Sequence, residues 1–423
     1  MAARVLHLCA AGSALGGAAI AAAAYSPQTR SWPRALEAVA LGFGLQFERA
    51  ADAAEQALRE ASTPVELWWA RAARAWASTG WQPRRTPADT PADTDALSDA
   101  LADLPALAAL PAHDRALPAH LLIESALGLA RLDDAVELQR VAQDGGTAAA
   151  ETALLDQDGA SNAYRTFLRA TEIRLLAFTG HIDRAAALLD ATPAPGDRRG
   201  ATLLDACRCL VVGNAARPGL TRRLAARLEG EQEPPSDLVS GGVRLLVAYG
   251  LVAVGDVQRA ARLAQAAGGD EGMSRLRTVD RGLAFELLVA AAGSVGDLAA
   301  ARLWADRSLV LEGSPISDST LARIESRVAL LEDRSADALA AASRAAALAQ
   351  LAGRAVEAAE AEMLRSQAQL ALDQCQEAVD GLSAVVHATD PDGFLAPRRN
   401  AAKQLRAHGL EVEPTPDVRS ETL

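Results

Sequence analysis

The sequence predicts an all-α protein built from stacked helical hairpins. Half of the 423 residues are apolar but only 4% are aromatic, and alanine and leucine supply most of the apolar ones, a composition that favours closely packed helices. A spacing of glycine and alanine recurs along the chain, and runs that alternate apolar and polar residues are almost absent. A chain of this length exceeds one compact core, so we expect two or three domains or one extended repeat array.

The repeat is a spacing of glycine, apolar and small residues. A glycine is followed two positions later by an apolar residue, three further on by a small residue, and four beyond that by a small or apolar residue. The glycine can adopt the left-handed conformation that ends a helix, and the small residue lets the next helix lie close to its partner. Each copy therefore predicts the second helix of a hairpin. The three complete copies are Gly180, Ile182, Ala185 and Leu189; Gly255, Val257, Ala260 and Ala264; and Gly296, Leu298, Ala301 and Ala305.

The same offsets predict further second helices at residues 47–58, 132–142, 338–345 and 378–385. The small residues expected at the closest helix approach are Ala50, Ala135, Ala185, Ala260, Ala301, Ala338 and Ala378. Their spacings are 85, 50, 75, 41, 37 and 40 residues, and the two longest predict degenerate units near 101–109 and 220–228. A period of about 40 residues is typical of a helical solenoid.

We place this repeat region at residues 33–410. Residues 82–95 contain a short tandem of proline, aspartate and threonine with no apolar face, which predicts a surface loop. Shorter breaks are expected at residues 191–200 and 230–237. Residues 411–423 are polar with two prolines, and this composition predicts a disordered tail.

The N-terminal segment, residues 1–32, is apolar and has two interpretations. Residues 5–25 carry no formal charge and follow Arg4, as in a signal peptide or a weak membrane anchor. However, the run is mostly alanine and glycine and lacks the leucine-rich centre that makes membrane insertion favourable. Cys9 is preceded by leucine, where a lipoprotein site has a small residue. We therefore favour a packed first helix, and a targeting segment stays open as the alternative.

The chain is acidic, with 42 basic and 54 acidic residues and a net charge of −12. Its basic residues are not concentrated in a patch, so we expect no nucleic-acid binding. The four cysteines, Cys9, Cys207, Cys209 and Cys375, are too few and too irregularly spaced for a disulfide framework or a zinc site. We expect reduced, packed thiols in a cytoplasmic protein.

No motif predicts a catalytic or metal site. The AGSVG segment at 292–296 is similar to a nucleophile elbow, but that motif follows a strand, whereas predicted helices flank this segment and Gly296 belongs to the repeat. His113 and His120 are seven residues apart on one helical face, without further ligands at metal-binding spacing. We therefore expect no enzyme, no cofactor and no bound metal.

Tryptophan is concentrated in one region. Five of the six tryptophans lie between residues 32 and 81, and Trp69 and Trp76 are seven residues apart on one helical face. Tryptophan is enriched at binding surfaces, which makes Trp68, Trp69 and Trp76 candidates for ligand binding. The alternative is that they pack in the core of the least repetitive unit.

The repeat offsets resemble tetratricopeptide (TPR) repeats over about residues 34–386. The match departs from that family in its period, in the scarcity of first-helix tryptophan and tyrosine, and in the missing terminal proline of most units. Long, alanine-rich units of this kind resemble the helical region of large LuxR-type, MalT-like bacterial transcription regulators. Residues 393–413 are similar to the last helix before the DNA-binding helix-turn-helix of those regulators. The basic residues of that segment are Arg398, Arg399, Lys403 and Arg406.

The resemblance implies a right-handed superhelical solenoid of TPR-like hairpins that acts as a non-enzymatic scaffold. Neither a helix-turn-helix nor a phosphate-binding loop is expected, since the loop needs a lysine and the single lysine is Lys403. The implied partner is a protein or peptide, or a small-molecule effector, bound in the inner groove without DNA contact by this chain. An alternative function is an exported or membrane-anchored TPR adaptor for envelope assembly.

Overall fold

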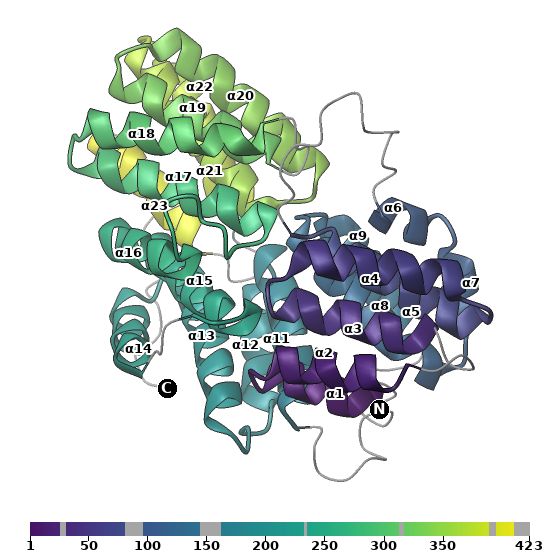
Figure 1. Ribbon diagram of the computed structural model, residues 1–423. Coiled ribbons are helices and arrows are strands. Elements are labelled where there is room, and N and C mark those ends of the chain that lie inside the picture. The colour runs from purple at the N-terminus through teal and green to yellow at the C-terminus, as the bar shows by residue number, and fades with distance from the viewer. Residues whose placement is uncertain are drawn as a thin grey trace.

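The structure is a computed structural model that describes residues 1–25, 31–80, 96–143, 162–231, 235–312, 317–388 and 395–409. Within these ranges the chain forms α-helices, one short 3₁₀ helix and no strand (Figure 1). The all-α prediction is therefore confirmed. The loop expected at 82–95 and the tail expected at 411–423 lie outside the described residues.

The helices follow one another along the chain in three parts. The N-terminal part comprises α1 (Ala2–Ala10), α2 (Ala14–Ala23), α3 (Ser31–Phe43), α4 (Phe47–Glu60), α5 (Pro64–Ala77), α6 (Ala96–Leu101), α7 (Leu104–Ala108), α8 (Ala112–Gly128) and α9 (Leu132–Gln143). The middle part comprises α11 (Asn162–Phe178), α12 (Ile182–Ala191), α13 (Arg198–Asn214), α14 (Pro218–Glu231), α15 (Leu238–Ala253) and α16 (Val257–Gly268). The C-terminal part comprises α17 (Thr278–Ser294), α18 (Leu298–Ser308), η1 (Leu309–Leu311), α19 (Asp318–Leu331), α20 (Ser335–Leu351), α21 (Ala355–Ala371), α22 (Cys375–Ala388) and α23 (Leu395–Ala407).

The turns inside the hairpins share one backbone feature. Gly180, Gly255 and Gly296 have φ angles of 88°, 82° and 72°, and each lies two residues before the following helix, as the repeat predicted. Other hairpins use a residue with a side chain at the same place, at a cost of roughly 1–2 kcal/mol each. These residues are Leu45, Ala130, Ala216, Asp333 and Asp373, with φ between 51° and 61°. The hairpin therefore recurs where the glycine is lost, including before α14, which covers the degenerate unit expected near 220–228.

The small residues predicted at the closest helix approach are all fully buried. Each has 0% of its surface exposed, and they are Ala50, Ala135, Ala185, Ala260, Ala301, Ala338 and Ala378. Protein interiors are packed so closely that a larger side chain at such a position meets the partner helix. The spacing rule therefore identified the packed face of each second helix.

The N-terminal apolar segment forms two short helices, α1 and α2, joined through Gly12, which has a φ of 91°. Leu6 and Cys9 on α1 are fully buried. Arg199 of α13 donates from Nε to the Ala10 carbonyl oxygen at 2.7 Å. These residues are therefore part of the packed core. Across the described part of the chain, no helix has both the length and the apolar character needed to span a bilayer.

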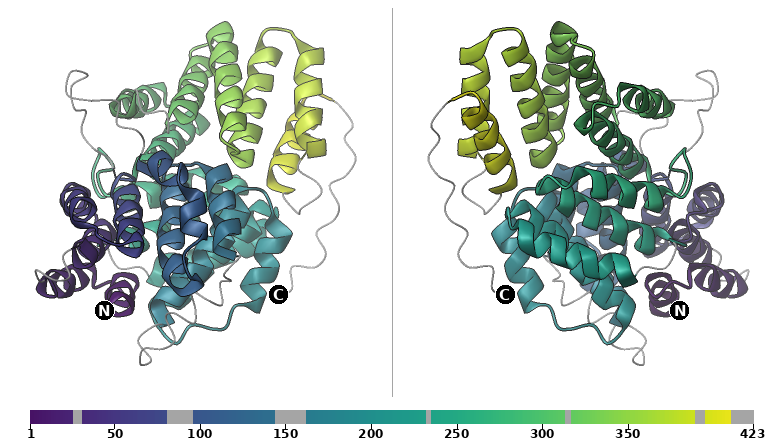
Figure 2. Two further views of the ribbon diagram at one scale, coloured as in Figure 1. Left: turned by 90° about the vertical axis from the view of Figure 1, so that its right-hand side faces the viewer. Right: turned by 90° about the vertical axis from the view of Figure 1, so that its left-hand side faces the viewer.

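The helices gather into three groups that meet at the centre of the molecule. In Figure 1, α1–α9 lie on the right, α11–α16 from the lower left to the lower centre, and α17–α23 at upper left. Figure 2 shows the green and yellow C-terminal helices standing side by side above the teal helices. Contacts between groups join α1 to α11, α8 to α17, and α13 to α23. The groups therefore touch at several places besides the chain connections.

Hydrogen bonds over long sequence separations hold the groups against each other. Arg354 donates from Nε to the Ala130 carbonyl oxygen at 3.0 Å, and the Thr278 N–H donates to the Thr79 carbonyl oxygen at 3.1 Å. The turn before α21 thus rests on the turn before α9, 224 residues earlier.

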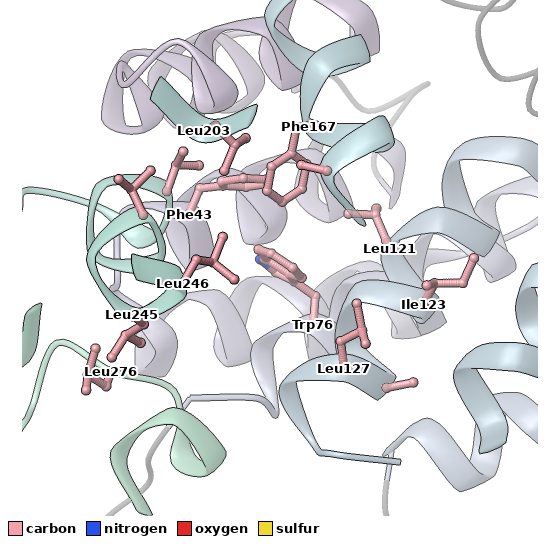
Figure 3. Close-up of a cluster of buried hydrophobic side chains, with 14 of the residues drawn as sticks. Phe43, Trp76, Leu121, Ile123, Leu127, Phe167, Leu203, Leu245, Leu246 and Leu276 are labelled. Atoms are coloured by element: carbon pink, nitrogen blue, oxygen red, sulfur yellow. The ribbon is translucent and has the colours of Figure 1, made fainter. Parts of the chain in front are cut away.

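The largest hydrophobic cluster takes in residues of all three groups, and Figure 3 shows part of it. The Phe43 ring of α3 lies with its centroid 4.9 Å from that of Trp76 on α5 and 5.2 Å from that of Phe167 on α11. Leu246 of α15 lies beside these rings in Figure 3. Burial of large aromatic side chains supplies much of the free energy that stabilises such a contact.

The four cysteines are free. Cys9, Cys207 and Cys209 are buried, and burial raises the pKa of both the Cys207 and Cys209 thiols to about 12. Cys375, the first residue of α22, is exposed. The prediction of packed thiols is therefore wrong for Cys375, because the start of α22 faces solvent there.

Candidate functional site

The three tryptophans proposed as ligand contacts lie on α5 in the hydrophobic core. Trp68, Trp69 and Trp76 have 1%, 4% and 0% of their surface exposed. Trp76 donates from Nε1 to the Val39 carbonyl oxygen at 3.1 Å, and the Arg71 guanidinium lies 4.9 Å from the centroid of the Trp68 ring. This placement agrees with the core-packing interpretation, and none of the three lines the cavity at the centre of the molecule.

The two histidines on α8 are not brought together. His113 is exposed, whereas His120 is buried and hydrogen-bonded to Tyr164 Oη and Thr171 Oγ1, both at 2.9 Å. Within the described ranges, no three histidine, cysteine or acidic side chains are grouped so that they could hold a metal ion. Gly296 lies in the turn between α17 and α18, so the segment similar to a nucleophile elbow is a hairpin turn.

A cavity of about 260 Å³ lies where the three groups of helices meet. Most of its wall comes from the first helix of successive hairpins, namely α8, α11, α13, α15, α17, α19 and α21. The first two turns of α23 add Ala396, Pro397 and Asn400. Small-ligand sites usually have volumes of about 300–1,000 Å³, so this cavity is slightly smaller than that range and suits only a small molecule.

Part of the cavity lining consists of large apolar side chains from α11, α13 and α15, which we call the apolar wall. Its residues are Phe167, Phe178, Leu203, Leu210, Leu245 and Leu246. Figure 3 shows that Phe167, Leu203, Leu245 and Leu246 belong to the same cluster as Phe43 and Trp76. The wall is therefore backed by the main hydrophobic core and is held rigidly.

The first of two charged networks in the cavity wall is centred on Glu124 of α8, which is fully buried. Glu124 Oε1 accepts hydrogen bonds from Arg174 Nη2 and Thr171 Oγ1, both on α11. Arg277 Nη1 lies 3.7 Å from Glu124 Oε2, and Arg277 Nε donates to Asp280 Oδ2 at 3.0 Å. The network thus joins one helix from each of the three groups.

The charges in this network determine its protonation states. Burial by itself would raise the pKa of Glu124, but the positive charges of Arg174 and Arg277 hold that pKa below its ordinary value. Burial lowers the pKa of His120 to about 4. Glu124 is therefore ionised and His120 neutral near pH 7.

The second network is centred on Arg323 of α19. Its guanidinium donates to both carboxylate oxygens of Glu286 on α17, at 2.7–3.0 Å, and from Nη1 to Glu357 Oε2 on α21 at 2.8 Å. Arg327 donates from Nε to Glu286 Oε1 and from Nη2 to Glu360 Oε2, both at 3.2 Å. Bidentate pairs of this kind are strong because both bonds are charge-assisted.

The two carboxylates bound by Arg327 have pKa values shifted in opposite directions. Burial favours a raised pKa for Glu286, but Arg323 and Arg327 together hold it below the ordinary value. The pKa of Glu360 is raised by burial and by the negative charge of Glu286. Two arginines therefore hold Glu286 in its ionised form. The same two arginines only partly offset the rise in the pKa of Glu360.

The members of the networks differ in how far their side chains are exposed to solvent. The side chains of Glu124 and Arg323 are each 1% exposed. Arg327 and Glu360, in contrast, are 25% and 28% exposed. This last pair is therefore the part of the charged networks that a bound molecule can reach most easily.

Neither network was predicted from the sequence. A signal was present, because charged residues interrupt apolar stretches of first helices, as Glu286 does in the run AFELLVAAA. A charge on a buried helix face needs a partner, since an unpaired buried charge is very costly. The partners lie on other helices, so their identity could not be read from the spacing.

The carboxylates of Glu124 and Glu286, one in each network, are both paired with arginines. These arginines hold the pKa values of Glu124 and Glu286 below the ordinary value, so both side chains are ionised and are weak proton acceptors. Neither a search of known protein-family models nor a search of curated proteins gives a match for this chain.

Proposed function

We propose that this protein is a non-enzymatic scaffold of TPR-like hairpins, wound as a right-handed superhelical solenoid, that binds a small molecule in its inner cavity. The observation that carries the proposal is the origin of the cavity wall. The first helices of successive hairpins supply it, from α8 to α21. In a stacked-hairpin array these helices form the concave surface, which is the surface that such proteins use for binding.

The proposed role is that of an effector sensor, as in the middle region of the LuxR-type regulators that the repeats resemble. Sensing requires that the bound state differ from the free state in its contacts. The cavity touches all three groups of helices, so a ligand there changes the contacts between groups. We propose a cytoplasmic location and a protein partner that responds to this change.

DNA contact has no part in the proposal. Of the basic residues on α23, Arg398 is buried, while Arg399, Lys403 and Arg406 are exposed. Three exposed cations on an acidic protein supply few phosphate contacts, whereas tight and salt-dependent DNA binding takes about six to ten.

The proposal is tested by filling the cavity at Gly242. Gly242 lies on α15 and lines the cavity, and a Cβ added there would meet no atom within 4 Å. Gly242→Phe therefore places a ring in the cavity without a clash at its Cβ. Gly230 on α14 also has no atom within 4 Å of an added Cβ and does not line the cavity, which makes Gly230→Phe the matched control.

The measurement is a thermal-shift screen of the full chain against a library of small metabolites. We expect compounds that raise the melting temperature of the wild type and of Gly230→Phe but leave Gly242→Phe unchanged, because ligand binding stabilises the folded state by mass action. The proposal is wrong if no compound behaves in this way, or if every stabilising compound acts equally on Gly242→Phe.

A further inference from the structure

The cavity contains two unlike surfaces, and together they restrict the chemistry of the ligand. The apolar wall on α11, α13 and α15 offers leucine and phenylalanine side chains. Helices α19 and α21 offer the ion pair of Arg327 and Glu360, whose side chains are 25% and 28% exposed. A ligand that covers both surfaces must be apolar over one part and polar over another.

The polar part of such a ligand would contact a positive and a negative side chain that lie next to each other. Arg327 Nη2 and Glu360 Oε2 are 3.2 Å apart. Charges interact strongly in the low dielectric of a cavity. An anionic group attracted to Arg327 is therefore repelled by Glu360, and a cationic group attracted to Glu360 is repelled by Arg327. A neutral group with donors and acceptors, or a zwitterion, satisfies both side chains.

The other charges near the cavity do not change this balance. Glu286 and Glu357 are both bound to Arg323, and the three side chains are between 1% and 16% exposed. Arg354 is paired with Glu357, Glu124 is paired with Arg174 and Arg277, and Arg277 also binds Asp280. Arg275 is exposed to solvent at the rim, where it donates from Nη1 to the Pro235 carbonyl oxygen at 2.9 Å. Solvent screens the charge of a group in that position.

We infer that the ligand of this cavity is a small amphipathic molecule with an apolar body and a polar head that carries no net charge. The body packs against the apolar wall, and the head bonds to Arg327 and Glu360. This inference rests on the proposed function and adds the chemical class of the ligand.

The test uses four amphiphiles that share an octyl chain and differ only in the head, each below its micelle concentration. Octyl glucoside is neutral, octylphosphocholine is zwitterionic, octanoate is anionic and octyltrimethylammonium is cationic. Calorimetric titration of the full wild-type chain is expected to give Kd values about tenfold lower for the uncharged and zwitterionic heads than for either charged head.

Two variants of the Arg327–Glu360 pair test the role of each charge separately. Glu360→Gln removes the carboxylate and leaves Arg327, so the affinity for octanoate is expected to rise about tenfold. Arg327→Gln leaves Glu360, so the affinity for octyltrimethylammonium is expected to rise by a similar factor. If Arg327→Gln fails to fold, the shift in Glu360→Gln by itself decides the question.

A matched control comes from the outer surface. Arg344 and Glu325 form an ion pair at 2.5 Å on α20 and α19, with exposures of 52% and 54%, and neither lines the cavity. Arg344→Gln and Glu325→Gln are expected to leave all four affinities unchanged. A head preference that is the same in Glu360→Gln as in the wild type overturns the inference, and so does tightest wild-type binding of a charged head.

The outcome also separates this inference from the proposed function. If none of the four amphiphiles binds, the inferred ligand class is wrong, whereas the proposed function is still decided by the Gly242→Phe screen. If all four bind equally to the wild type and to Gly242→Phe, they bind outside the cavity and the inference is likewise wrong.

Discussion

Arg323 of α19 and Glu286 of α17 form a bidentate ion pair inside the protein, with Nη2 2.7 Å from Oε2 and Nε 3.0 Å from Oε1. The two side chains are 1% and 6% exposed. Because Arg323 also binds Glu357 on α21, one guanidinium connects the first helices of three successive hairpins. Removal of one partner from such a group leaves a buried charge without compensation.

The first prediction concerns this pair. Glu286→Gln is expected to destabilise the protein by roughly 3–5 kcal/mol, because Arg323 and Arg327 lose the anion that they share. Urea denaturation followed by circular dichroism measures the change. Glu325→Gln serves as control, because its exposed pair with Arg344 is expected to contribute about 1 kcal/mol or less. If both variants lost the same free energy of unfolding, the buried network would contribute no more to stability than an exposed ion pair.

The second prediction concerns pH. Burial lowers the pKa of His120 from an ordinary value of 6.5 to about 4. Between these two pH values His120 is therefore protonated in the unfolded chain but neutral in the folded chain. The free energy of unfolding is therefore expected to fall as the pH drops from about 6.5 to about 4, by up to roughly 3 kcal/mol from this residue.

The check is to compare denaturation of His120→Gln and His113→Gln with the wild type across this pH range. His120→Gln is expected to flatten the pH dependence, because the titrating group is gone. His113 is exposed, so His113→Gln is expected to keep the wild-type slope. If the slope were retained in His120→Gln, the pH dependence would have to come from other groups.

The third prediction concerns the left-handed turns. Gly255 has a φ of 82°, and a Cβ there would meet no atom within 4 Å. Gly255→Ala is therefore a test of backbone strain alone and is expected to cost about 1 kcal/mol. Gly230 is the next-to-last residue of α14 and has the same free space, and Gly230→Ala is expected to stabilise by up to about 0.5 kcal/mol. Shifts of the same sign in both variants, measured by thermal denaturation, would contradict this assignment.

The fourth prediction concerns the N-terminal helices. Leu6 on α1 is fully buried, so Leu6→Ala is expected to cost about 2–5 kcal/mol. Leu15 on α2 is 54% exposed, and Leu15→Ala is expected to stay within about 0.5 kcal/mol of the wild type. A Leu6→Ala variant as stable as the wild type would mean that α1 contributes little to the core, as the targeting-segment alternative requires.

The sequence by itself determined the local structure. The helices, the left-handed turns at Gly180, Gly255 and Gly296, and the fully buried alanines such as Ala260 all agree with the spacing. Each depends on residues within a few positions of one another, because helix faces and glycine conformations are local properties of the chain.

Only the tertiary structure decided which residues meet. Arg323 lies 37 residues from Glu286, and Arg354 lies 224 residues from the carbonyl oxygen that it binds. Leu45 and Ala216 adopt the left-handed backbone conformation, which a side chain disfavours. They can do so because the packing of the helices on either side offsets the local cost. Pairings of this kind depend on how hairpins stack, and for that reason the cavity and its charged networks became visible only in the folded protein.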